Sequence, residues 1–146
     1  MMLFEVGVRM ERTLESGKLA KVVEQYVVDA LSFTEAETRI ISETGAYGTD
    51  IEVLSMKRSR CTELIGNGGK EKWFKAKVNY ITIDEKTEKE RKTPYYYFVN
   101  AETIADAKST VDEFFRGTLI DYSIATLDET KVLDVFRHDL NAGNAD

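Results

Sequence analysis

The sequence predicts an α+β fold made of two internally duplicated ββαβ units, with antiparallel sheets, one helix per repeat and pseudo-two-fold symmetry. Residues 3–10 align with residues 73–80 at an offset of 70, and residues 26–36 align with residues 97–107 at an offset of 71. The first aligned pair alternates apolar and polar residues with the period of a β-strand. The second pair reads as the end of a strand followed by the start of a helix. Repetition in the same order indicates a duplicated supersecondary unit.

Each copy is expected to run strand, hairpin, strand, helix, strand and short extension. Gly17 supplies the positive φ that the first hairpin needs, whereas the second hairpin loop, residues 84–91, is highly charged and therefore solvated. The lone Pro94 is expected to open a strand, where a missing N–H is tolerated. The expected strands and extensions are residues 4–12, 21–28, 51–58 and 62–65 in the first copy, and 74–83, 93–99, 122–126 and 132–136 in the second.

Both helices are expected to start with the same capping chemistry. Ser32 is followed three residues later by Glu35, and Thr103 by Asp106, a spacing typical of a capping box. The expected apolar stripes are Ala36, Ile40 and Ile41 in the first helix and Ile104, Ala107, Val111, Phe114 and Phe115 in the second. The expected helix ends are Gly45 and Gly117.

The domain organisation follows from these repeats. Residues 1–66 form the first repeat, the Gly-rich residues 67–70 a connector, and residues 71–136 the second repeat. A half of about 65 residues supports only a marginal core of its own, so the repeats are expected to share one core in one domain. Residues 137–146 are expected to form a flexible acidic tail. A strand rather than a helix is expected after the Gly-rich connector, so it is interpreted as a linker and not as a phosphate loop.

The composition excludes several kinds of site. One Cys and one His exclude a disulfide framework and a zinc site built from Cys and His. A Cys61 and His138 catalytic pair is weighed against an ordinary strand cysteine, and the latter is favoured because a nucleophile needs a positioned base. Asp29 and Asn100 take equivalent positions before the helices and are expected to cap or form turns rather than hold a metal. We therefore expect no enzyme activity, no metal and no cofactor.

The sequence also contains no segment that suggests a membrane or secreted protein. Its apolar runs are far shorter than the roughly 18–20 residues of a membrane-spanning helix. The N-terminal residues lack a basic region and a small-residue cleavage site, so no secretory signal is expected. A cytoplasmic location follows as the expectation.

Aromatic and basic residues are interleaved in a way that favours binding to single-stranded nucleic acid. Bases stack on aromatic rings while Lys and Arg follow the phosphates. The formal charge of −6 argues against a generally basic surface, but residues 120–146 hold 2 basic and 6 acidic residues, so much of the acidity is C-terminal. A solvated strand surface with aromatic side chains at its rim is the alternative. The candidate nucleic-acid-binding residues are Trp73, Lys75, Lys77, Tyr95, Tyr97, Lys57, Arg58 and Arg60.

Two motifs carry a family resemblance. The segments Val28-Asp-Ala-Leu-Ser-Phe-Thr-Glu-Ala-Glu37 and Trp73-Phe-Lys-Ala-Lys-Val78 resemble the domain of unknown function 4494 family. The resemblance extends from Leu3 to about Phe136. It implies an origin in Bacteroides-type gut bacteria or in their phages and mobile elements, and it implies no activity and no residue roles.

These observations lead to one preferred function and one alternative. The preferred function is a non-enzymatic binding protein of a phage or mobile element that contacts single-stranded nucleic acid. The alternative is a protein-interaction or small-anion-sequestering accessory module that counters host defence, because duplicated folds create pockets between copies. A host or phage protein is then a possible partner, and the choice between monomer and homo-oligomer stays open. A hydrolase with an unfamiliar site is a third hypothesis, which a cleft with convergent titratable groups would support.

Overall fold

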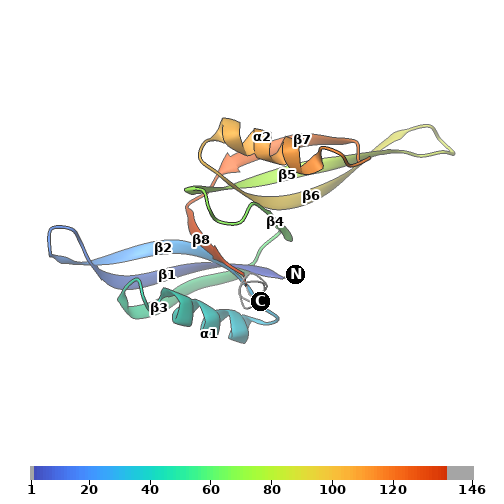
Figure 1. Cartoon of the computed structure of the whole chain (residues 1–146). Helices are drawn as coiled ribbons and strands as arrows, with labels where there is room; N and C mark the ends of the chain where they lie inside the picture. The colour runs from blue at the N-terminus through green and yellow to red at the C-terminus, as the bar shows by residue number, and fades with distance from the viewer. Residues whose placement is uncertain (1, 138–146) are drawn as a thin grey trace, which may run out of the picture. The chain divides into compact units, whose positions relative to one another are not determined.

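The structure, a computed structural model, describes residues 2–137 and confirms the α+β class (Figure 1). Within this range the chain forms two helices and eight strands. In chain order they are β1 (Leu3–Thr13), β2 (Leu19–Asp29), α1 (Phe33–Thr44), β3 (Thr49–Arg58), β4 (Glu63–Ile65), β5 (Lys72–Ile83), β6 (Glu90–Ala101), α2 (Ile104–Phe115), β7 (Tyr122–Glu129) and β8 (Val132–Phe136).

The chain divides into two compact units. Unit 1 consists of Met1–Ser59 together with Lys131–Asp146, and unit 2 consists of Arg60–Thr130. These boundaries do not follow the expected repeats. The strand β4 follows β3 of unit 1 in the sequence but belongs to unit 2, and β8 follows β7 of unit 2 but belongs to unit 1.

Each unit contains one four-stranded sheet. The strand orders are β3-β1-β2-β8 in unit 1 and β4-β6-β5-β7 in unit 2. The longer strands pair antiparallel, as expected, but β8 pairs parallel to β2 and β4 pairs parallel to β6. The expectation of purely antiparallel sheets is therefore corrected to mixed sheets. Alternation of apolar residues identifies a strand but does not encode its partner or its direction.

Each unit buries one helix against one face of its sheet. In unit 1 the alternate β1 residues from Phe4 to Met10 pack with Ala36 and Ile40 of α1. The core of unit 2 is built in the same way, from side chains of the sheet and of one helix. The sheet contributes Phe74, Ala76, Val78, Tyr97, Val99 and Ala101, and α2 contributes Ala107, Val111 and Phe115. Residues on one side of a strand share a face, which explains why alternate positions enter the core.

The expected helix caps are confirmed. Ser32 Oγ accepts a hydrogen bond from the Glu35 backbone N–H, and Thr103 Oγ1 accepts one from the Asp106 backbone N–H, each at 3.1 Å. The acidic side chain in turn accepts from the backbone N–H of the residue before the cap, at 3.0 Å in α1 and 2.9 Å in α2. These bonds satisfy amide groups that a helix N-terminus otherwise leaves without partners.

The helix C-termini differ from each other. Gly45 caps α1 in a right-handed conformation with φ −58°, whereas α2 ends at Phe115 and Gly117 follows with φ 84°. Ile41, Ile104 and Phe114, which were expected in the apolar stripes, are 43%, 56% and 45% exposed. Among the described residues, no helix has the length and apolar character needed to cross a membrane.

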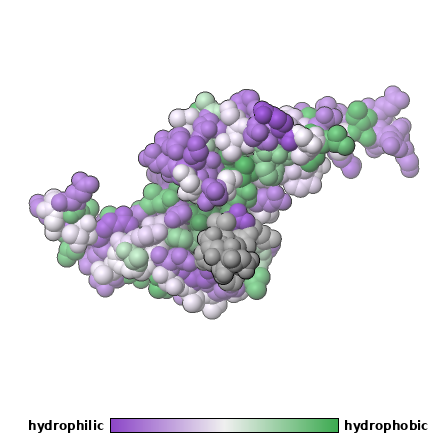
Figure 2. Space-filling model, viewed as in Figure 1, coloured by the Kyte–Doolittle hydropathy of each residue, from purple (hydrophilic) through white to green (hydrophobic). Residues whose placement is uncertain are grey.

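The two hairpins form largely as expected. Gly17 has φ 84° in the first, and the charged tip of the second is exposed and hydrophilic (Figure 2). Pro94 does not open β6 but lies inside it, opposite Asn79 of β5. At that point β6 has only β5 as a neighbour, because β4 pairs only with residues 97–99, so proline is tolerated near an open edge.

Candidate nucleic-acid interface

Two predicted lysines lie on the face of the unit 2 sheet that α2 does not cover. Lys75 and Lys77 alternate along β5 with core residues and are half-buried. On the neighbouring strand β6, Lys75 is paired with Phe98 and Lys77 with Tyr96. Residues opposite each other in adjacent strands share a face, so both lysines lie beside aromatic rings.

These rings hold cations in place. Lys75 Nζ lies 5.5 Å from the ring centroid of Phe98, and Arg60 Cζ lies 5.4 Å from that of Tyr96. Both distances are within the range of cation–π attraction. We call Arg60, Lys75, Lys77, Tyr96 and Phe98 the cation–ring face. Its charge is partly offset by Asp128 of β7, which is paired with Lys75, whereas Thr126 is paired with Lys77.

Trp73 is on the same side of β5 but is not available for stacking. It is 3% exposed, and Phe98 is fully buried. The Trp73 carbonyl accepts hydrogen bonds from both the backbone N–H and the hydroxyl of Thr130, at 3.0 and 2.7 Å. The interpretation of Trp73 as part of a solvent or ligand face does not fit this burial, because a stacking platform must expose its ring.

Tyr95 and Tyr97 lie on the opposite face of the sheet, toward α2. Tyr97 is 3% exposed and packs edge-on against Phe115, and its hydroxyl is hydrogen-bonded to that of Tyr80. Burial, followed by the Tyr80 hydrogen bond, raises the pKa of Tyr97. Tyr95 is 42% exposed and packs on Tyr80 with a centroid distance of 4.1 Å. These two tyrosines therefore close the core of unit 2 and do not join Lys75 and Lys77.

The remaining predicted cations are divided between the units. Lys57 and Arg58 end β3 in unit 1, whereas Arg60 belongs to unit 2. All three are exposed. The structure thus brings Arg60, Lys75 and Lys77 together on one face.

Tyr96 and Phe98 were not predicted as part of the site. Alternation along β6 already placed them on one side and Tyr95 and Tyr97 on the other. The missing information was the register between β5 and β6, which decides which rings lie opposite the lysines. Register depends on pairing between distant segments and is not visible in either strand alone.

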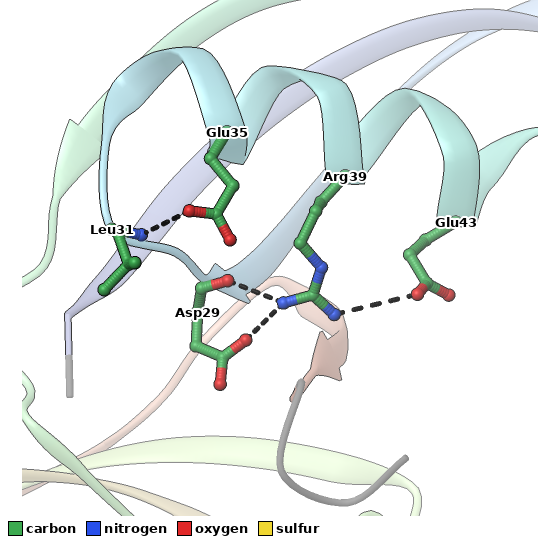
Figure 3. A network of polar contacts seen from close by, with 5 residues as sticks. All are labelled: Asp29, Leu31, Glu35, Arg39 and Glu43. Carbon is green, nitrogen blue, oxygen red and sulfur yellow. Dashed lines mark hydrogen bonds and ion pairs between the residues drawn. The ribbon is translucent and has the colours of Figure 1, made fainter. Parts of the chain in front are cut away.

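Asp29 and Asn100 were expected to cap the helices or form turns, but the structure shows other contacts for both. Asp29 forms an ion pair with Arg39, which also donates to the Asp29 carbonyl at 2.6 Å and lies 3.8 Å from Glu43 (Figure 3). Asn100 instead binds the backbone around the start of β5. Its Nδ2 donates to the carbonyls of Lys70 and Lys72 at 3.1 and 2.8 Å. Its Oδ1 accepts from the Lys70 N–H at 2.8 Å.

A backbone turn at Gly66 directly precedes the Gly-rich connector, residues 67–70. Gly66 has φ +99°, and a Cβ there would lie 2.9 Å from Asn100 Cβ. The strand β5 follows the connector, as expected. Gly66 therefore allows both the backbone turn and the close approach to Asn100.

Within residues 2–137, no group of three or more His, Cys, Asp and Glu could hold a metal ion. Cys61 forms no disulfide and is 2% exposed. His138 and the rest of the expected acidic tail after Arg137 lie outside the described residues.

The fold and this face define a two-unit α+β protein with a cation-bearing sheet surface. The chain belongs to the family described as Domain of unknown function (DUF4494), whose model matches residues 2–138. This match confirms the family resemblance found in the sequence. No curated protein matches the chain significantly.

Proposed function

We propose that the protein is a non-enzymatic, cytoplasmic binding protein of a phage or mobile element, and that its cation–ring face contacts single-stranded nucleic acid. The observation that supports this proposal is the grouping of Arg60, Lys75 and Lys77 beside Tyr96 and Phe98 on one sheet face. Cations held next to rings are a recurring feature of surfaces that follow a single-stranded backbone.

The contacts are electrostatic rather than stacking contacts. Phe98 is fully buried and Tyr96 is half-buried under Arg60, so the rings position the cations. Binding of this kind reads phosphates and is independent of sequence. Affinity then falls with salt, by about 0.7 in the logarithmic slope for each phosphate contact to a single strand.

Fluorescence polarisation of labelled oligonucleotides tests this proposal. At about 50 mM salt we expect binding by tens of micromolar protein, and a loss of affinity of roughly fivefold or more for Lys77→Ala and for Arg60→Ala. Lys18→Ala is the matched control, since Lys18 lies in an exposed hairpin of unit 1. Absence of binding by the unmodified protein, or an equal loss in the Lys18 variant, contradicts the proposal.

A second candidate function is a protein-interaction module. It is supported by large apolar side chains exposed around the start of α1, with Leu31 82% and Phe33 55% exposed. Native mass spectrometry of the protein purified from a host lysate is the test. A partner bound in stoichiometric amount, and lost in a Leu31→Ser variant, supports this function, whereas recovery of the chain alone contradicts it.

We infer further that the two units arose by duplication with exchange of their last strands. The two sheets have the same strand order, and their ladders shift register at aligned positions, between Gly7 and Val8 and between Lys77 and Val78. When β1, β2 and β3 are matched with β5, β6 and β7, the order β3-β1-β2-β8 matches β7-β5-β6-β4, so β4 and β8 are equivalent strands. Each of them pairs in the sheet of the other repeat. An experimental structure in which β4 pairs with β2 contradicts the exchange.

A further inference from the structure

The face of the unit 2 sheet that carries the cations continues onto the hairpin formed by β5 and β6. The two strands pair as far as Ile83 and Glu90, whereas the pairing of β5 with β7 ends at Tyr80. The rest of the hairpin is therefore a two-stranded arm that extends past the other elements of unit 2 (Figure 1). One face of this arm continues the cation–ring face, and the other continues the face that α2 covers.

The register of the hairpin places a further lysine on the cation–ring face. Lys92 is paired with Ile81, which lies on the same side of β5 as Lys77, because alternate residues of a strand share a face. The preceding residue, Arg91, is paired with Thr82 and lies on the opposite face. Both Arg91 and Lys92 are exposed. Of these two adjacent cations, Lys92 alone extends the row formed by the lysines of β5.

A neutral donor lies between Lys77 and Lys92 in this row. Asn79 is half-buried and is paired with the exposed Pro94. An asparagine amide can donate hydrogen bonds to phosphate oxygens. From Lys75 to the level of Lys92 the row is about 20 Å long, at about 3.4 Å per residue of an antiparallel strand. A strand stacked as in a duplex advances about 3.4 Å per nucleotide, so this length corresponds to about six nucleotides.

Carboxylates limit the row at both ends. Beyond Lys92, the next residue of β6 on this face is Glu90. At the other end, Asp128 of β7 is paired with Lys75. A phosphate chain that crossed the sheet from Arg60 over Lys75 would reach Asp128, and like charges repel. A chain that follows the hairpin meets lysines and a neutral amide instead.

The row also holds cations that the protein does not neutralise itself. Lys72 and Lys108 of unit 2 each form an ion pair with a carboxylate. Among residues 2–137, no ion pair involves Lys77 or Lys92. Their charges therefore remain available for phosphate groups, whose binding releases counterions.

The aligned face of unit 1 has a different charge. Carboxylates occupy two positions of β1 that are aligned with the row, Glu5 and Glu11. Arg9 lies between them on the same side of β1 and forms an ion pair with Glu52 of β3. The row of cations is therefore a feature of unit 2 and not of the shared strand arrangement.

We propose that a bound single strand runs lengthwise along the β5–β6 hairpin, and that Lys92 is a further phosphate-binding residue. This inference rests on the proposed function, because it extends the same cation–ring face. The strand follows Lys75, Lys77, Asn79 and Lys92, and Arg60 flanks this row beside Tyr96.

Fluorescence polarisation with a labelled single strand of about 12 nucleotides, measured between about 50 and 200 mM salt, tests the path. We expect Lys92→Ala to lower affinity roughly threefold or more at about 50 mM salt and to reduce the logarithmic salt slope by about 0.7, the value of one phosphate contact. The double variant with Lys77→Ala should reduce the slope by about 1.4. Arg91→Ala is the matched control, because Arg91 is adjacent, exposed and equally charged but lies on the other face. It should bind like the unmodified protein.

The outcomes separate this inference from the proposed function. Binding that weakens in Lys77→Ala but not in Lys92→Ala, or that weakens equally in Arg91→Ala, overturns the path along the hairpin and leaves the proposed function standing. Absence of binding by the unmodified protein overturns both.

Competition with shorter unlabelled strands tests the length of the row. A strand of about eight nucleotides should compete nearly as well as one of about 12, whereas one of about three covers half the row and should compete far more weakly. Equal competition by all three lengths overturns a contact row that reaches Lys92.

Discussion

Units 1 and 2 share a plan but differ in the side chains at one end of the sheet. Both have the same strand order, one capped helix and a buried phenylalanine at the aligned positions 4 and 74. In unit 1 a buried Glu24 is paired with Arg12 beside an open cavity. In unit 2 the aligned region holds Tyr80, whose hydroxyl is hydrogen-bonded to that of Tyr97 and whose ring packs on Tyr95.

This difference shows that the same backbone arrangement can hold either a buried ion pair or packed aromatic side chains at this end of the sheet. Aromatic packing buries apolar surface and fills space, which stabilises a small core. A buried ion pair costs desolvation and is weak evidence for a stabilising role. The Arg12 and Glu24 pair of unit 1 is therefore not by itself a sign that this end of the sheet is more stable.

The segments that precede the helices show a second difference. Asp29, at the end of β2, forms an ion pair with Arg39 of the following helix, whereas Asn100 uses both donors and its acceptor on the backbone around the start of β5. An ion pair requires a charge, and a bridge to two carbonyls requires N–H donors. The two residues are therefore not interchangeable, although they occupy aligned positions.

The largest expected effect comes from the aligned core phenylalanines. Phe4→Ala and Phe74→Ala should each lower the free energy of unfolding by about 3–5 kcal/mol, because each leaves a cavity in a cluster of buried residues. Hydrogen exchange should show the loss of protection concentrated in the unit that carries the substitution. Leu119→Ala, at a fully exposed position, should change stability by less than about 0.5 kcal/mol. Equal loss of protection in both units would show a single cooperative core.

Exchanging the chemistry of the aligned Asp29 and Asn100 should give a smaller effect. Asn100→Asp should cost about 2–3 kcal/mol, since it removes the donors to the Lys70 and Lys72 carbonyls. Folding raises the pKa of the introduced carboxyl, which faces these carbonyls, so stability should recover as the pH falls through the raised folded pKa and should be fully recovered below the unfolded pKa. Urea unfolding at several pH values measures both effects. Asp29→Asn, which keeps an oxygen for Arg39, should cost about 1 kcal/mol, and a larger loss there contradicts this account.

The helix caps should contribute equally in the two units. Ser32→Ala and Thr103→Ala should each cost about 1 kcal/mol, because each leaves one backbone N–H of the first turn without its bond. Chemical denaturation followed by circular dichroism gives the values. Ser32→Thr and Thr103→Ser keep the hydroxyl and should change stability by only about a few tenths of a kcal/mol. A loss in the conservative variants equal to that in the alanine variants would exclude capping as the cause.

The last effect, alkaline destabilisation through Tyr26, is absent at neutral pH and develops only above pH 10. Burial, followed by the Glu24 charge, raises the pKa of Tyr26 from the ordinary 10.0 to about 12, so the fold favours the neutral phenol. This stabilisation is complete below pH 10 and is lost as the pH rises toward 12, with a slope of at most about 1.4 kcal/mol per pH unit. Tyr26→Phe should reduce the slope measured by denaturation at alkaline pH. An unchanged slope in this variant would assign the dependence to other tyrosines, Tyr97 first.

Much of the local structure could be predicted from the sequence. Alternation identified the strands, Gly17 identified a hairpin, and the Ser32 and Thr103 spacings identified both helix starts. These features depend on residues close together in the chain, and local backbone and side-chain preferences decide them. The family was also identifiable, because its motifs are contiguous.

The site residues were only partly predictable. Lys75 and Lys77 were correctly placed on one side of β5, but the rings opposite them required the register with β6. The inward positions of Arg12 and Glu24 were visible in principle, since both continue the core-facing alternation of β1 and β2. A charged residue at an inward position is the signal that could have revealed the cavity.

The sequence by itself determined where strands, turns and helix caps occur and which side chains share a side of each strand. Only the tertiary structure decided that β4 and β8 join sheets away from the strands they follow, that Trp73 is buried, and that Glu24 borders a cavity. The physical reason is the separation along the chain of the residues that determine each feature. Periodicity is a property of neighbouring residues, whereas strand partners, burial and cavities depend on contacts between segments that are distant in the chain.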